Sequence, residues 1–172
     1  MIVILLQLVA IVGVAIYLYR WRAAVRRRSM QSWDSLLTRL SHEWSARVLS
    51  DQFLWKEGLS TTPDEIWQRM EGPKGLWVIF KNAGVMLEMA DYAVRHSDGV
   101  DRLLLETLRS DAMQIRVCVL TALSQYAFSQ ASEGVRINAY RAASFYASMA
   151  ASMTQLIQQN AAGILPDFVA AM

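Results

Sequence analysis

Acidic side chains and one histidine gather around the end of a helical stretch, and their types and spacing suggest metal chemistry. They are Glu88, Asp91, His96, Asp98 and Asp101. A Glu and an Asp three residues apart share one helix face and can ligate a divalent cation together. One hypothesis is therefore a membrane-bound enzyme, or a helical bundle that binds a ligand or metal through Glu88, Asp91 and His96.

The same side chains are also typical of a solvated helix end, where acidic residues act as N-caps. Metal-binding helical bundles use Glu-x-x-His pairs from several helices, and the sequence contains no such pair. It also lacks a glycine-rich phosphate loop, a His-Glu-x-x-His motif and a nucleophile elbow. These absences favour a protein that is not an enzyme, with no catalytic residue, metal or cofactor.

Cysteine content and charge narrow the function further. Cys118 is the single cysteine, so neither an intrachain disulfide nor a paired-cysteine zinc site forms, and its apolar surroundings favour a small buried side chain. Five of the 17 basic residues lie between Arg20 and Arg28, which leaves 12 basic against 15 acidic residues, a net charge of −3. This balance argues against a nucleic-acid partner.

The N-terminal run is apolar from Ile2 to Leu18 except for Gln7, and with the next residues it is about long enough to cross a ~30 Å hydrocarbon core. Aromatic and arginine side chains follow it, as they do at a membrane interface. We therefore predict a transmembrane anchor over residues 1–28. Because arginines stay on the cytoplasmic side, we expect a single-pass inner-membrane protein with its N-terminus outside. The predicted interface residues are Tyr17, Tyr19, Arg20, Trp21, Arg22, Arg26, Arg27 and Arg28.

Two other interpretations of this run are weaker. A cleaved signal peptide places its positive charge before the apolar run and a small-x-small site after it, and here the order is reversed. A buried core helix seldom continues this far without a polar face.

The remaining chain predicts an all-α fold: a cytoplasmic bundle of about five to six helices over residues 29–160, followed by an apolar tail over 161–172. Helical periodicity covers about 30–57, 76–97 and 135–160. Thr62, Pro63 and Glu65 form an N-cap and capping-box pattern for a short helix from residue 63 to about 71. The tail either folds back on the core or is a docking peptide.

Residues 99–131 form either one helix or two, with Ser97 or Asp98 as the first N-cap and a second possible cap at Ser110-Asp111. If there are two, LLLETLRSDAMQIRVCVLTAL resembles a single HEAT-type helix pair, with Asp111 in the turn and Cys118 and Ala122 at small core positions. No second unit follows in register, so the resemblance implies similar packing and carries no function.

Aromatic and small side chains suggest where a partner binds. Three tryptophans recur at intervals of 11, which places them on one stripe of a continuous helix, either as core or as a docking face. The last helix is rich in Ala and Ser and has no charge between Arg141 and Asp167, which indicates a central bundle helix, a covered face or, over 142–165, a second membrane segment. The predicted partner-binding residues are Trp33, Trp44, Trp55, Phe145, Met149 and Phe168.

These observations predict a membrane-anchored helical module for protein interaction, an accessory or scaffolding subunit of an inner-membrane complex. Its expected partners are the lipid bilayer and either other proteins of that complex or a second copy of the chain. A sensory domain that reports across the bilayer is a third hypothesis.

Overall fold

The computed structural model describes residues 32–41, 62–97, 99–129 and 132–171. Trp33–Met172 form one compact unit. Its described part is helical with no strand, so the all-α bundle is confirmed. The predicted anchor at 1–28 lies outside the described residues. None of the described helices combines the length and the apolarity needed to cross a bilayer.

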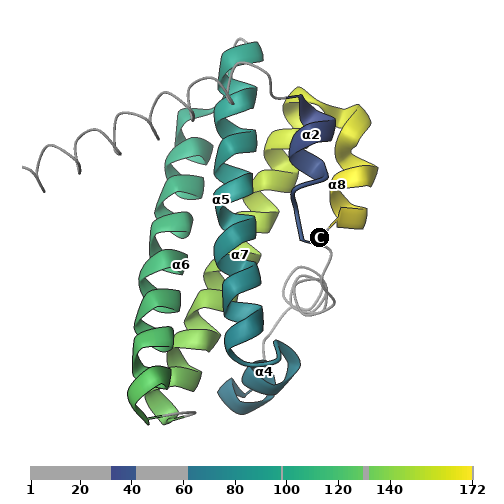
Figure 1. Cartoon of the computed structure of the whole chain (residues 1–172). Helices are drawn as coiled ribbons and strands as arrows, with labels where there is room; N and C mark the ends of the chain where they lie inside the picture. Colours follow the sequence, from purple (N-terminus) through teal and green to yellow (C-terminus); the bar gives the residue numbers. More distant parts are fainter. Residues whose placement is uncertain (1–31, 42–61, 98, 130–131, 172) are drawn as a thin grey trace, which may run out of the picture. The chain divides into compact units, whose positions relative to one another are not determined.

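Three long helices make up the bundle, with α7 at its centre, where it packs against α4, α5, α6, η1 and α8. Figure 1 shows α5 and α6 lying alongside it, while α4 covers one end and α2 and α8 pack together at the other. The helices are α2 (Trp33–Leu37), α4 (Pro63–Arg69), α5 (Pro73–His96), α6 (Arg102–Ser129), α7 (Glu133–Asn160), the 3-10 helix η1 (Ala162–Ile164) and α8 (Leu165–Ala171).

Small side chains allow α6 and α7 to pack closely along their length. α7 buries five alanines in the bundle, which confirms the central helix predicted for this stretch. Asp111 on α6 bonds to Ser148, and seven residues further along α6 Cys118 lies near Arg141. The two helices are therefore antiparallel and in register along a line of close contacts. The buried alanines are Ala139, Ala142, Ala143, Ala147 and Ala150.

The start of α4 forms as predicted, because its capping signals are local. The Glu65 N–H donates to Thr62 Oγ1 at 3.3 Å, and the Thr62 N–H donates to Glu65 Oε2 at 3.1 Å. α4 ends sooner than expected, and Gly72, at φ 64° and ψ −129°, turns the chain directly into α5. Pro73 is the first residue of α5, so that helix begins three residues before the predicted Leu76.

α6 is one helix of 28 residues, so the HEAT-type pair is wrong. Asp111 does not cap a second helix, because its side chain is buried against α7, where it bonds to Ser148. The N-cap role falls to Asp101, whose Oδ1 accepts from the Leu103 N–H at 2.9 Å. Ser97 instead ends α5, and Asp98 lies outside the described residues.

The helix predicted over about 30–57 is much shorter in its described part. α2 ends at Leu37, and a turn leads through Leu40 to Ser41, while the rest of that prediction lies outside the described residues. Ser41 is held by the side chain of Asn82 on α5, which also donates to the Tyr146 hydroxyl of α7 at 3.1 Å. This buried hydrogen-bond cluster therefore joins three segments.

The C-terminal tail folds back onto the bundle. Phe168 and Ala171 of α8 are 1% and 3% exposed, and α8 packs against α7 and α2. Of the two alternatives for this tail, the packed segment is the one observed.

Candidate functional site

Three of the residues that suggested a metal site take part in other interactions: Glu88, Asp91 and His96. Glu88 forms two contacts with Arg39, at 2.5 and 3.0 Å, and Asp91 lies 3.8 Å from Arg109. The His96 ring stacks on Tyr92, and its Nδ1 donates to the Tyr92 carbonyl at 2.9 Å. Within the described residues no three His, Cys, Asp or Glu side chains are placed to hold a metal ion. The described residues therefore give no support for a metal site.

The predicted partner-binding residues lie in different environments. Trp33 is half-buried and packs edge-on against Tyr92, with ring centroids 4.9 Å apart, and Phe145 packs partly buried against the core. Met149 and Phe168 are buried in the core, so a partner that binds to the surface of this bundle would not touch them. Trp44 and Trp55, like the predicted membrane-interface residues, lie outside the described residues.

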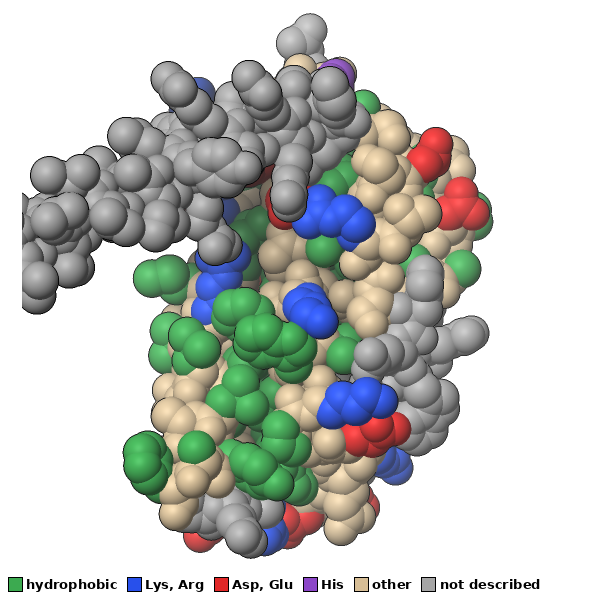
Figure 2. Space-filling view, in the orientation of Figure 1, with side chains coloured by type: hydrophobic (Ala, Val, Ile, Leu, Met, Phe, Trp, Pro, Cys, Tyr) green, Lys and Arg blue, Asp and Glu red, His purple; other side chains and the backbone are tan. Residues whose placement is uncertain are grey.

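Large apolar side chains are instead exposed along the side of α6 that faces away from the core. We call this side the outer face of α6. Phe128 is 93% exposed and Leu103 is 73% exposed, whereas a typical core position of the same helix, Leu108, is fully buried. Figure 2 shows hydrophobic side chains gathered over α5 and α6. The exposed apolar residues of the outer face are Leu103, Met113, Val117, Leu120 and Phe128.

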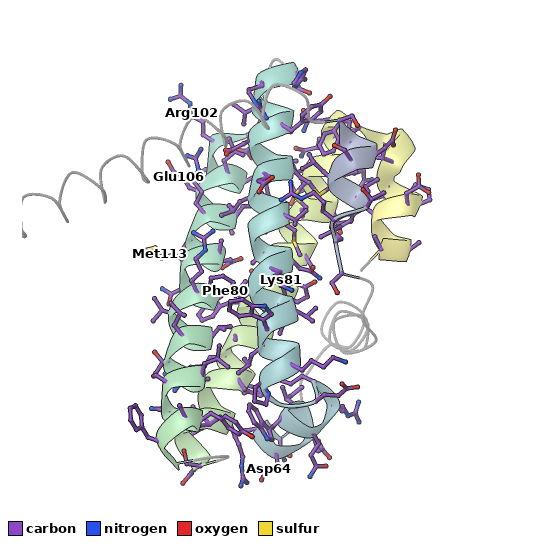
Figure 3. The ribbon with its side chains drawn as sticks, in the orientation of Figure 1. Asp64, Phe80, Lys81, Arg102, Glu106 and Met113 are labelled. Atoms are coloured by element: carbon purple, nitrogen blue, oxygen red, sulfur yellow. The ribbon has the colours of Figure 1, made fainter. Side chains whose placement is uncertain are left out.

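Three arginines follow one edge of the outer face, and we call them the arginine row. Arg102, Arg109 and Arg116 are seven residues apart and all exposed. Figure 3 shows Arg102, Glu106 and Met113 extending from α6 away from the other long helices. The Arg109 contact with Asp91 joins two half-exposed side chains at 3.8 Å, which is a weak pair.

The outer face was missed in the sequence because α6 carries two apolar stripes. Leu104, Leu108 and Ile115 face the core, while Met113, Val117 and Leu120 face outward. Both stripes have helical spacing, so periodicity does not distinguish them. A signal was nevertheless present, since a helix that is apolar on opposite sides is typical of a position between two neighbours.

No known family model, characterised protein or solved structure matches this chain. Its function is therefore argued from the exposed and buried residues themselves.

A buried carboxylate lies on the opposite side of α6, at the contact with α7. Asp111 is 8% exposed, and its Oδ2 is buried with no hydrogen-bond partner in the described part of the chain. Burial raises the pKa of Asp111, and the hydrogen bond to Ser148 opposes part of this shift. Protonation of Asp111 is thus more favourable in the folded than in the unfolded chain, and the ionised form costs stability.

We expect Asp111→Asn to raise the free energy of unfolding at neutral pH by about 1 kcal/mol, because Asn removes the buried charge and still accepts from Ser148. In the parent chain, the folded state binds more protons than the unfolded state above the ordinary Asp pKa. Stability should therefore fall as pH rises from about 4 through the raised pKa, and then level off. Denaturant unfolding of the full chain in mild detergent, repeated across this pH range, measures both effects.

The matched control is Asp91→Asn, which removes an exposed carboxylate paired with Arg109 and should change stability by less than ~0.5 kcal/mol. A loss of stability in Asp111→Asn, or an unchanged pH profile, would contradict this account of Asp111.

Proposed function

We propose that this chain is a membrane-anchored helical interaction module, an accessory or scaffolding subunit of an inner-membrane protein complex, which docks its partner on the outer face of α6. The observation that carries the proposal is the exposure of large apolar side chains along a helix whose other side is fully packed. Contiguous exposed apolar surface is typical of sites where another macromolecule binds.

The composition around this face agrees with docking. From Val117 to Ser132 the sequence has no charged residue, although this stretch includes the exposed residues Leu120 and Phe128. Trp77 of α5 is 47% exposed and stacks on Phe80 at 5.3 Å between ring centroids, so the neighbouring helix also exposes aromatic surface. Interface centres are depleted in charge and enriched in aromatic residues and Met. The membrane part of the proposal is supported by the apolar run and arginine cluster over residues 1–28.

Site-specific photocrosslinking in the native membrane tests the proposal. A photoreactive phenylalanine analogue at Leu120 should yield an adduct with one protein, and the same protein should be captured from Met113. The control position is Gln158 on α7, which is exposed and far along the chain from the outer face, and it should yield no such adduct. If positions 113, 117, 120 and 128 all give no protein adduct, docking on this face is wrong.

A further inference from the structure

We propose that the outer face of α6 binds one helix of another protein, and that this helix carries carboxylates along the edge that meets the arginine row. This inference rests on the proposed function, because it names the partner of the same face. It is argued from the spacing of the exposed residues and from their charge.

The exposed residues of α6 repeat as the contact line of a helix pair does. Alternating steps of three and four residues connect Ser110, Met113, Val117, Leu120, Ser124 and Ala127, and all six are exposed. Such a seven-residue repeat keeps two helices in contact over several turns. The serines and the alanine leave room for a close approach, while Met113, Val117 and Leu120 supply apolar area.

The two edges of this contact line differ in charge. The arginine row lies on one edge, with Arg109 and Arg116 directly before the contact residues Ser110 and Val117 in the sequence. The other edge carries Thr107, Gln114 and Thr121, which are uncharged. In paired helices the flanking positions select the partner through charge. A partner that places Glu or Asp opposite the arginine row is therefore favoured.

A second copy of the chain fits this pattern poorly. In an antiparallel pair of α6 helices the two arginine rows would face each other, and like charges would repel. In a parallel pair each arginine row would face the uncharged edge of the other copy, so no ion pair would form. Charge thus favours a different protein as the occupant.

A lipid surface also fits less well. Glu106 lies in line with the contact residues, one helical turn before Ser110, and it is exposed. The arginine row would attract anionic headgroups, but the Glu106 carboxylate would be repelled by them and would lose its water on insertion. A partner helix can place a basic side chain opposite Glu106, and a polar residue within a helix contact line fixes the register of the pair.

Two synthetic helices serve as probes for this partner. Both are about four heptads long with the same Leu and Ala contact line. One carries Glu on both flanking edges and the other carries Lys. Fluorescence anisotropy measures their binding to the full chain in nanodiscs of zwitterionic lipid. We expect the Glu peptide to bind and the Lys peptide not to bind, and we expect added salt to weaken the complex.

Charge reversal identifies the edge that the peptide meets. Arg116→Glu should weaken binding of the Glu peptide about fivefold. Lys74→Glu is the matched control, because it makes a similar charge reversal at an exposed site at the start of α5 and should leave binding unchanged. The triple variant Arg102→Glu, Arg109→Glu and Arg116→Glu should reverse the preference and bind the Lys peptide. Far-ultraviolet circular dichroism checks that each variant keeps its helix content.

Three results would overturn the inference. The first is equal binding of both peptides that the triple variant does not change. The second is dimerisation of the full chain that Leu120→Asp abolishes. The third concerns a variant with Leu120→Cys and Cys118→Ser, in which an environment-sensitive dye is attached to the new cysteine. A blue shift of the dye's emission when anionic lipid is added without peptide would show that the face binds lipid. If Leu120 still crosslinks to one protein while the Glu peptide fails to bind, the proposed function stands and the acidic partner is wrong. If neither the crosslink nor the peptide complex forms, the proposed function and the acidic partner are both wrong.

Discussion

Gly75→Ala is expected to lower the free energy of unfolding by at least about 3 kcal/mol. Gly75 lies in the first turn of α5, where the end of α4 passes directly over it. A Cβ atom at this position would lie 2.0 Å from the Met70 carbonyl oxygen and 2.6 Å from Met70 Cβ. The first of these atoms belongs to the backbone, so α4 and α5 must move apart to accept one methyl group.

The size of this effect follows from the core side chains that the contact between α4 and α5 holds in place. Ile66 of α4 and Met70, which caps the end of α4, are fully buried, and α4 packs against α7. A shift of α4 therefore opens the core at this end of the bundle, where lost contacts add to the backbone strain. A loss of this size is a large part of the ~5–15 kcal/mol that stabilises a typical domain.

Gly84→Ala is the matched control, since it makes the same change two and a half turns further along α5. A Cβ atom at Gly84 would meet no atom within 4 Å, and the residue lies inside a helix. Ala there should raise stability by about 0.5–1 kcal/mol, because it restricts the unfolded chain more than Gly does. Denaturant unfolding of both variants as full chains in mild detergent compares them. Similar effects of the two substitutions would contradict the close α4 to α5 contact.

Asn82→Ala is expected to lower the free energy of unfolding by about 3 kcal/mol, which is the second large effect. Asn82 is fully buried on α5. Its Oδ1 accepts from the Ser41 N–H at 2.9 Å, and its Nδ2 donates to the Ser41 carbonyl at 3.3 Å and to the Tyr146 hydroxyl at 3.1 Å. Ala removes all three hydrogen bonds at once and leaves a cavity. The segment after α2 should loosen first, which hydrogen exchange at Ser41 would detect.

Tyr146→Phe separates the two halves of this cluster, because it removes the hydroxyl and keeps both bonds between Asn82 and Ser41. We expect the free energy of unfolding to fall by about 1 kcal/mol and the hydrogen exchange of the Ser41 amide to stay unchanged. Burial raises the pKa of Tyr146 to about 12, although the Asn82 hydrogen bond lowers it in part. Stability should therefore fall as pH rises from about 10 to 12, where the unfolded chain has already lost the proton. In Tyr146→Phe the fall of stability between about pH 10 and 12 should be smaller. Equal losses of unfolding free energy in Asn82→Ala and Tyr146→Phe would contradict the role of Asn82 in holding Ser41.

Local signals in the sequence determined the elements that the structure confirms. The capping box at Thr62 and Glu65 starts α4 because its hydrogen bonds connect residues three apart. The long helix over residues 135–160 was predictable for the same reason, since its apolar residues repeat at helical spacing over many turns. The break between the helices predicted over 63 to about 71 and over 76–97 was predictable too, although only the structure shows that the chain turns within Gly72.

Tertiary contacts decided the residues on which function depends. Both apolar stripes of α6 have the spacing of a buried helix face. Packing against α5 and α7 buries the stripe that includes Leu108. The same packing exposed Met113 and Leu120 and buried Asp111 against Ser148, and a separate long-range contact paired Glu88 with Arg39. These outcomes depend on residues far apart in the chain, and helical periodicity reports only the neighbours of a residue within its own helix. The sequence by itself therefore determined that residues 99–131 are helical, and the bundle determined that α6 is one helix and which of its two apolar sides remains for a partner.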